Sequence, residues 1–211
     1  MIKKLVLLTV CVWATILPSL SHDQEIDAFT SLQVRSLAGV SKESFKDFFV
    51  ECFTKGYEGL TLEQLGKADH PNLEHFLTKV AYEEWEKETN PTSPLEKTYR
   101  LLFFQDFQIV GYVSMVLEDD GNTVYLTQGC LAPDLWGKGA VSYVINTIIP
   151  TYALKAKRYN LLTRVLNTRA IKAYEKIGFQ KDLSGELVKK HHYSVDHFIG
   201  MTKTRVLPLS E

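Results

Sequence analysis

Two segments of the sequence combine residue types that could bind a phosphate-bearing ligand and move a proton. In the first, residues 131–141, an expected strand ends at Pro133 and a short loop leads into an expected helix. Such a loop leaves several backbone N–H groups unpaired at the positive end of the helix dipole. A pyrophosphate is the natural occupant, and Gly137 and Gly139 would let it approach the backbone closely. Taken alone, the same residues could equally form a tight strand-to-helix turn.

The second segment, residues 167–179, is expected to be a helix that begins at Asn167. Asn167 and Tyr174 are seven residues apart, so they lie on one side of the helix about two turns from each other. Ala170 lies between them and is small, so a flexible ligand could lie along this face. A tyrosine hydroxyl there could donate a proton to a leaving thiolate. The alternative is an amphipathic helix with an N-cap asparagine and a core tyrosine.

Together the two segments resemble the GNAT acetyltransferase superfamily. The first is similar to its acyl-CoA loop, Q/R-x-x-G-x-G/A, with Trp136 at the first place, Gly139 at the central glycine and Val141 at the last place. The second matches every specified position of the pattern N-x-x-A-x-x-x-Y-x-x-x-G-F. Trp136 lacks the cation and the hydrogen bonds of Arg or Gln, and Val141 is β-branched where a small residue is usual. These departures predict weaker coenzyme binding rather than none.

The resemblance also implies a role for individual residues. Backbone amides of residues 137–141 would bind the coenzyme pyrophosphate, with Lys138 adding charge at the rim. The pantetheine arm would lie between the strands at 126–131 and 161–165, and Tyr174 would be the general acid. Acetyl-CoA would be the co-substrate, an amine the acceptor, and no metal would be needed. The implied coenzyme-binding residues are Leu131, Trp136, Gly137, Lys138, Gly139, Ala140, Val141 and Asn167.

The general base is not evident from the sequence. Many family members keep an acidic residue on the fourth strand, and Tyr125 stands at about that place here. Glu118, His191 and His192 are candidates elsewhere, although each could simply be a solvated polar residue. Cys130 could lie near the thioester, but no activating partner is visible, which favours a buried structural cysteine.

The elements that must position these residues alternate between strand and helix. Their order predicts a mixed, mostly antiparallel twisted α/β sheet flanked by helices, and the resemblance implies the acyl-CoA N-acyltransferase fold. In the helical region before the first hairpin, Leu73, Phe76, Val80 and Trp85 are expected near one face. The expected strands are 32–37, 99–104, 108–116, 124–131, 159–166, 179–181 and 197–205, and the expected helices 42–57, 62–87 (interrupted near 69–71), 139–152 and 168–177.

The first 21 residues have the pattern of an export signal. Lys3 and Lys4 precede an apolar run over residues 5–17, and Ser19 and Ser21 stand at the −3 and −1 places of a cleavage site. An uncleaved anchor or a first core helix would be the alternatives. We therefore expect a signal peptide over 1–21, a polar lead-in over 22–31, a GNAT-like domain over 32–206, and an exported protein, periplasmic or secreted.

Composition excludes some classes of partner. The 24 basic and 25 acidic residues give a formal net charge of −1, without the basic runs of a nucleic-acid surface. No apolar run is long enough to span a bilayer, so no stable membrane span is expected after signal removal. The many acidic residues between Glu58 and Glu88 would favour a cationic amine, although a charge-rich helix is usually a solvated face.

Two functions remain open at this point, because export conflicts with the use of an intracellular metabolite such as acyl-CoA. One is an exported N-acetyltransferase that moves an acetyl group from acetyl-CoA to an amine by direct transfer, for example inside another cell. The other is a catalytically inactive GNAT-fold binding or interaction module. Trp136, Val141 and the missing acidic base favour the second function, whereas the intact pair of Asn167 and Tyr174 favours the first.

Overall fold

The computed structural model describes residues 29, 31–90 and 97–205, so the segment predicted as a signal peptide lies outside the described residues. Seven strands form one sheet in the order β1-β2-β3-β4-β5-β7-β6. Every neighbouring pair is antiparallel except β4 and β5, which confirms the predicted mixed, mostly antiparallel sheet. The strands are β1 (Gln33–Ser36), β2 (Thr98–Gln105), β3 (Gln108–Glu118), β4 (Thr123–Leu131), β5 (Arg158–Arg164), β6 (Gln180–Asp182) and β7 (Phe198–Thr204).

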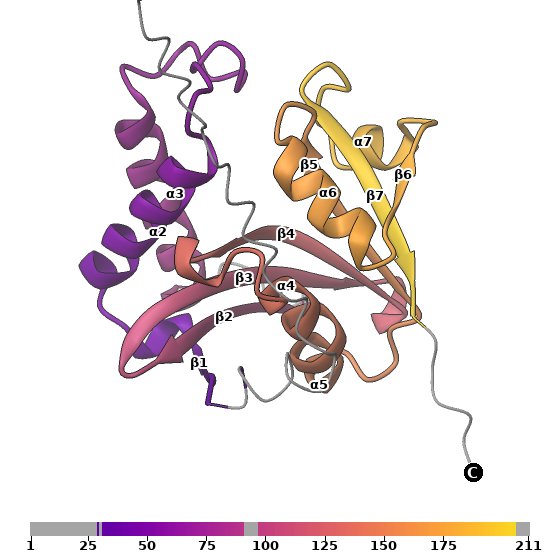
Figure 1. Ribbon diagram of the computed structural model, residues 1–211, viewed down its shortest axis with the longest axis horizontal. Helices are drawn as coiled ribbons and strands as arrows, with labels where there is room; N and C mark the ends of the chain where they lie inside the picture. Colours follow the sequence, from indigo (N-terminus) through magenta and orange to yellow (C-terminus); the bar gives the residue numbers. More distant parts are fainter. Residues whose placement is uncertain (1–28, 30, 91–96, 206–211) are drawn as a thin grey trace, which may run out of the picture.

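Helices cover both faces of the sheet (Figure 1). α2 (Lys42–Gly56) and α3 (Leu73–Thr89) pack on one face, and α4 (Ala140–Tyr143) and α5 (Ile149–Tyr152) pack on the other. α6 (Thr168–Lys176) and α7 (Glu186–Lys190) lie beside the β5–β7 half of the sheet. In the described part of the chain, no helix is long and apolar enough to cross a membrane.

The two apolar cores follow from the alternation of side chains along β2. Leu101 and Phe103 point into the core under α4 and α5, whereas Leu102 and Phe104 point into the core under α2 and α3. Near the N-terminus of the described chain, Phe29 is buried beside the loop before α4 and contacts Tyr143, with ring centres 5.6 Å apart. The segment expected as a polar lead-in thus contributes a buried aromatic ring to this corner of the molecule.

The parallel pair of β4 and β5 separates part-way along its length. Its ladder joins residues 123–126 to residues 158–161 and goes no further. On the other side of β4 the register with β3 shifts, because Met115 pairs with Leu126 while Ser114 pairs with Gln128, leaving Thr127 as an extra residue. A bulge of this kind bends the strand that carries it. β4 and β5 therefore diverge toward their C-terminal ends, as the resemblance implied (Figure 1).

Sequence periodicity misplaced part of the helical region before the hairpin. Residues 62–66 form turns rather than helix, and α3 begins only after Asn72, whose side chain accepts a hydrogen bond from the His75 amide at 2.7 Å. The fully buried face of α3 is Leu77, Ala81 and Glu84, spaced one turn apart, while the four predicted apolar residues are only partly buried. The prediction missed this face because it followed the larger apolar side chains, which flank the buried line, and did not expect an acid there.

Two further local features were not predicted. The helix expected over 139–152 forms, but residues Val144–Ile148 make a π turn between α4 and α5. Pro150 follows at the start of α5, and proline cannot donate the next helical hydrogen bond, which explains the irregular turn. The polar segment 182–196 contains the short helix α7, where Asp182 accepts the Leu187 amide at 2.8 Å.

Candidate active site

A cavity of about 710 Å³ opens where β4 and β5 diverge. Residues from α2, α3, β4, β5 and α6 line it, so segments far apart in the sequence meet at one place. Both chemically suggestive segments reach this cavity. Of the predicted site residues, it is lined by Leu131, Trp136, Gly137, Val141, Asn167 and Tyr174, whereas Lys138, Gly139 and Ala140 lie behind or beside the lining.

The loop before α4 offers free backbone donors. Gly137 and Gly139 both have positive φ, 73° and 83°, a conformation that glycine adopts without strain. Within the described residues, the amides of Gly137, Gly139, Ala140 and Val141 donate to no other backbone group. A Cβ added at Gly137 would meet nothing within 4 Å, so a ligand can approach the backbone there. The loop therefore has the unpaired N–H groups and the open space that a pyrophosphate requires.

Trp136 holds the loop against the end of β4 and carries a cation on its outer face. Its indole Nε1 donates to the Leu131 carbonyl at 2.8 Å. The guanidinium of Arg169, on the first turn of α6, lies over the indole ring, 3.7 Å from its centre. Both side chains line the cavity. The expectation that Trp136 leaves the loop without a neighbouring cation was therefore incomplete, because Arg169 supplies a positive charge from another element.

The C-terminal half of β4 presents peptide groups toward the gap. The Ala132 amide donates to the Val110 carbonyl at 2.8 Å, on the β3 side. Peptide groups of an antiparallel strand alternate in direction, so those of Gly129 and Leu131 point away from β3 and toward the gap. The Leu131 carbonyl already accepts from Trp136 and from the Cys52 thiol at 3.1 Å. The remaining groups on this edge can pair with an extended amide-bearing ligand.

Asn167 is both the N-cap of α6 and part of the cavity wall. Its Oδ1 accepts a hydrogen bond from the Ala170 amide at 3.1 Å. The helix cap and the ligand-contacting role are therefore compatible, because the cap uses the carbonyl oxygen and leaves the Nδ2 donors available. Ala170 and Ala173 continue the same wall with small side chains.

Tyr174 lies two turns further along α6, also in the wall. Burial raises the pKa of its hydroxyl to about 12, and the neighbouring Tyr57 and Cys130 act in the same direction. The hydroxyl is therefore protonated at neutral pH and has a proton to donate. This state suits a general acid, although the same burial makes the phenol a weaker acid than in water.

The match to a family model decides how this arrangement is classified. Residues 47–179 match the model of the acetyltransferase (GNAT) family, which is more than half of the chain. The chain belongs to the GNAT acetyltransferase family. The matched range begins in α2 and ends just after α6. It therefore contains the loop before α4, the C-terminal half of β4, and both Asn167 and Tyr174.

Solved GNAT structures share the fold at low sequence identity. A PaiA N-acetyltransferase from Thermoplasma acidophilum in complex with coenzyme A is 18% identical, with a TM-score of 0.61, 83% of this chain covered and 99% of that chain. An acetyltransferase from Streptococcus agalactiae 2603 is 15% identical, with a TM-score of 0.58 and coverage of 84% and 100%. A spermidine N-acetyltransferase SpeG chimera from Vibrio cholerae and hSSAT is 16% identical, with a TM-score of 0.52 and coverage of 83% and 96%. No curated protein sequence matches the chain.

Two of the suggested general bases lie outside the cavity of this GNAT protein. Glu118 pairs with Lys190 at 2.7 Å and lies 3.7 Å from the Nε2 of His191, and the His191 ring stacks on Tyr125 at 3.5 Å between centres. None of these residues lines the cavity, whereas His192 does. His197, which sequence reasoning did not single out, lines the cavity beside Gly66.

Both cysteines of the described chain line the cavity as free thiols. Burial raises the pKa of Cys130 well above its usual value, and contact with Cys52 adds to this effect. A cysteine nucleophile needs the opposite shift, because the thiolate is the reactive form. The interpretation of Cys130 as a structural residue therefore fits its surroundings better than a catalytic one. The described residues contain no group of three or more His, Cys, Asp or Glu that could hold a metal ion.

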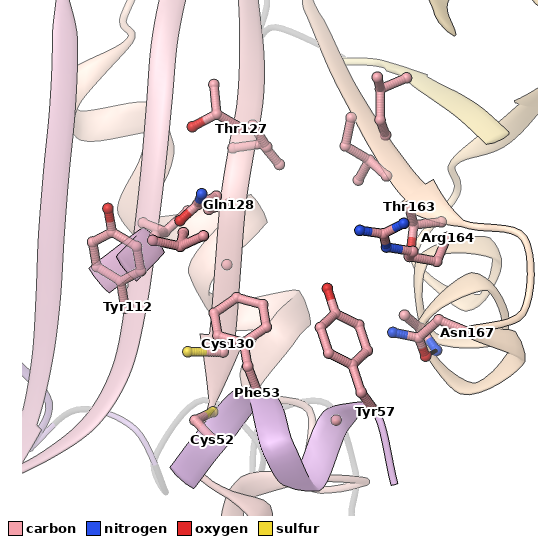
Figure 2. Close-up of a pocket in the computed structure, with 18 of the residues that line it drawn as sticks. Cys52, Phe53, Tyr57, Tyr112, Thr127, Gln128, Cys130, Thr163, Arg164 and Asn167 are labelled. Carbon is pink, nitrogen blue, oxygen red and sulfur yellow. Dashed lines mark hydrogen bonds between the residues drawn. The ribbon is translucent and has the colours of Figure 1, made fainter. Parts of the chain in front are cut away.

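Sequence reasoning missed the polar residues on the α2 side of the cavity. Figure 2 shows Tyr57, at the end of α2, directing its hydroxyl toward the same space as the guanidinium of Arg164 from β5. Gln128, next to the β4 bulge, also lines the cavity, and its buried Oε1 has no hydrogen-bond partner in the described chain. No motif marks these positions, because they come from three elements that meet only in the folded chain.

Proposed function

We propose that this protein is an exported N-acetyltransferase that moves an acetyl group from acetyl-CoA to an amine by direct transfer. One observation carries the proposal. The unpaired amides of the Gly137–Val141 loop, the free peptide edge of β4 and the protonated hydroxyl of Tyr174 all meet around one cavity. A diphosphate, an amide-bearing arm and a thioester follow one another in acetyl-CoA, and these three features would accommodate them in that order.

The loop residues bind and orient the donor. Amides of residues 137–141 would hold the pyrophosphate, with Arg169 adding a charge beside Trp136. The β4 peptide groups at Gly129 and Leu131, together with the Asn167 amide, would pair with the pantetheine arm. An N–H on this edge of β4 would polarise the thioester carbonyl. The small side chains of Ala170 and Ala173 leave room for the arm along α6.

The transfer step forms one bond and breaks one. The neutral amine attacks the acetyl carbon, the new C–N bond forms, and the C–S bond breaks. Tyr174 donates its proton to the departing sulfur. The proton lost by the amine passes to solvent, for which His192 and His197 in the cavity lining are candidate relays, and Tyr174 takes up a proton from solvent to complete the cycle. The products are the N-acetylated acceptor and the coenzyme thiol.

Coenzyme binding is the first test, because it separates an active transferase from an inactive binding module that has lost the coenzyme site. The purified protein is heated with and without acetyl-CoA at about a hundred times its dissociation constant. Ligand binding to the folded state alone should then add about 2.7 kcal/mol to the free energy of unfolding. Mass spectrometry of an amine library incubated with acetyl-CoA should then reveal acceptors that gain one acetyl group.

Two outcomes would overturn the proposal. The absence of any stabilisation at millimolar acetyl-CoA would contradict the coenzyme site. Stabilisation without transfer to any amine, and without hydrolysis of the thioester, would favour the inactive binding module. Export is tested separately, by the N-terminal mass of the protein produced in its own host. A mature chain that begins at His22 outside the cytosol supports export, and a cytosolic chain retaining residues 1–21 contradicts it.

A further inference from the structure

Arg164 is a buried cation at the C-terminal end of β5. Only 7% of its surface is exposed, yet it lines the cavity. Its NH1 donates to the Leu65 carbonyl in the segment between α2 and α3, and its guanidinium lies over the Phe198 ring, 4.4 Å from the centre. These contacts hold the side chain in place without neutralising its charge.

Arg164 has hydrogen-bonding capacity that the described chain does not use. Its buried Nε has no acceptor, and no carboxylate of the described residues pairs with it. Glu84 is a buried acid that also lines the cavity, but it already forms salt bridges with Arg100 at 3.0 Å and Lys87 at 2.9 Å. A buried charge without a counter-charge is costly, so a ligand that brings an anion to this place would relieve the cost.

Arg164 lies in a part of the cavity away from the loop expected to hold the pyrophosphate. The coenzyme loop lies beside α4, whereas Arg164 lies beneath the segment that joins α2 to α3, next to Tyr57. Tyr57 directs its hydroxyl toward the same part of the cavity (Figure 2). The Tyr57 hydroxyl therefore lies beside Arg164 and can donate a hydrogen bond to the same ligand.

The charge lining the cavity also favours an anion. Of the six charged side chains that line it in the described chain, four are cations (Lys67, Lys87, Arg164 and Arg169) and two are acids (Glu83 and Glu84). Glu84 and Lys87 form an ion pair with each other, so the cavity keeps three other cations and one acid without a described ion pair, Glu83, which is exposed. Two acids of the acidic stretch noted in the sequence, Glu83 and Glu84, thus line the cavity, but the cations there outnumber them.

We propose that Arg164 and Tyr57 bind a carboxylate carried by the acceptor, so that the acceptor is an amine that also bears a carboxylate, such as a free amino acid. The inference rests on the proposed N-acetyltransferase function and names its substrate class. A guanidinium matches a planar carboxylate with two parallel hydrogen bonds, and a phenol hydroxyl donates a third. The single buried guanidinium suits one carboxylate better than a phosphate, which presents more charge than this site offers.

The test compares amino acids with their own carboxamides as acceptors. Each pair has the same side chain and differs in whether the carboxyl group is charged. Because amidation also lowers the pKa of the neighbouring amine, the rates are compared at equal concentrations of the neutral amine. Initial rates of acetylation are measured for leucine and leucinamide, lysine and lysinamide, and glutamate and its α-amide, with ethanolamine phosphate as the phosphate-bearing comparison. We expect kcat/KM to be roughly ten- to a hundredfold higher for the acids, the factor that a hydrogen bond to a charged group supplies.

Three variants test whether Arg164 and Tyr57 cause the preference for acids over amides. Arg164→Gln should remove the preference for acid over amide by raising KM for the acids, and Arg164→Lys should restore part of it. Tyr57→Phe, a milder change, should reduce the preference without removing it, which keeps the test valid if Arg164→Gln does not fold. Arg158→Gln is the matched control, because Arg158 lies on the same strand, is exposed and does not line the cavity.

Each outcome separates this inference from the proposed function. Equal rates for acids and amides, or a preference for amides or ethanolamine phosphate, would overturn the carboxylate site while leaving the transferase intact. If Arg164→Gln slows acids and amides by the same factor, Arg164 is only structural. If acetyl-CoA fails to bind and no amine is acetylated, the proposed function fails. Stabilisation of the wild-type protein, but not of Arg164→Gln, by N-acetylleucine would then still support the carboxylate site, and its absence would contradict that site as well.

Discussion

The guanidinium of Arg169 lies 3.7 Å from the centre of the Trp136 ring, so the first turn of α6 is joined to the loop before α4. The GNAT pattern has Arg or Gln at the position of Trp136, where one side chain contributes polar contacts near the phosphates. Under the proposed function, two side chains would share that role in this protein. Trp136 fastens the loop to the Leu131 carbonyl, and Arg169 brings the charge.

Arg169→Ala should weaken the binding of coenzyme A without changing the fold. Loss of a charge-assisted contact to a phosphate predicts a dissociation constant roughly ten- to a hundredfold higher. Isothermal titration calorimetry at two salt concentrations measures this. Binding by the wild-type protein should also weaken more steeply with salt than binding by the variant, because the lost contact is ionic. Lys172→Ala, an exposed cation on the same helix outside the cavity lining, is the control. Equal affinities for Arg169→Ala and wild type would remove Arg169 from the phosphate site.

Tyr174→Phe should lower kcat while leaving coenzyme affinity nearly unchanged, because only the hydroxyl is lost. Removal of a general acid predicts a loss of about a hundredfold or more. Tyr143→Phe, whose ring packs on Phe29 away from the cavity lining, should leave kcat unchanged. A Tyr174→Phe variant with wild-type kcat would show that the leaving thiolate is protonated by another group.

The pH profile of kcat gives an independent check on Tyr174. Burial raises the pKa of this hydroxyl to about 12, so the acid form persists throughout the range below pH 11. The rate should rise with pH as the amine loses its proton and then stay level, with no descending limb near the ordinary tyrosine pKa of about 10. A descending limb near pH 10 that vanishes in Tyr174→Phe would show that Tyr174 titrates normally.

The order of strands along the chain, most helices and both segments that reach the cavity could be predicted from the sequence, because each depends on local signals. Apolar alternation marked the strands of the sheet, and capping residues such as Asn167 marked helix starts. The bulge at Thr127 and the π turn before Pro150 were not predicted, since neither leaves a distinct local pattern. The separation of β4 and β5 followed from family resemblance and not from the residues themselves.

The polar residues Tyr57 and Arg164 in the cavity could not be predicted from local patterns. From the sequence, Tyr57 was expected only to end an amphipathic helix, and Arg164 only to lie near the end of a strand. Their convergence depends on how the segment after α2 folds over β5, which no spacing within either element encodes. Glu84 was misplaced for a related reason, because an acidic residue is expected in solvent unless its partners on other elements are known.

Cys130→Ala should retain the kcat of the wild-type protein. The raised pKa keeps this buried thiol protonated, and a protonated thiol is a poor nucleophile. Steady-state kinetics measure kcat, and intact-mass analysis after rapid quenching looks for an acetylated enzyme. A drop in kcat accompanied by an acetyl group on Cys130 in the wild-type protein would replace direct transfer with a covalent route.

Asn167→Ser separates the two roles of Asn167. A serine caps a helix about as well as asparagine, so the melting temperature should stay near that of wild type, whereas Asn167→Ala should lose about 1 kcal/mol. Both variants lack the Nδ2 donor, so both should raise KM for acetyl-CoA to a similar extent. If KM rises only in the destabilised Asn167→Ala variant, the side chain acts through the helix cap and not through the coenzyme.

Glu84→Gln should make the free energy of unfolding less dependent on pH in the acidic range. The Glu84 carboxylate accepts hydrogen bonds from Lys87, Arg100 and, at 3.1 Å, the Tyr112 hydroxyl. Burial alone would raise the pKa of Glu84, but the charges and hydrogen bonds of Lys87 and Arg100 outweigh it and hold the pKa below the ordinary value of 4.5. A carboxyl whose folded pKa is lowered stabilises the protein fully above the unfolded value and loses this contribution as pH falls through the folded pKa.

The variant should therefore be less stable than wild type at pH 7, by about 2 kcal/mol, since Arg100 keeps only its longer contact with Glu88 at 3.5 Å. The gap should narrow as pH falls below 4.5 and close once wild-type Glu84 is protonated. Urea unfolding from pH 7 to pH 3 measures both proteins, with Glu83→Gln as the exposed neighbour control. A constant difference between Glu84→Gln and wild type across this range would mean that Glu84 contributes by packing alone, and that its charge adds nothing to the fold.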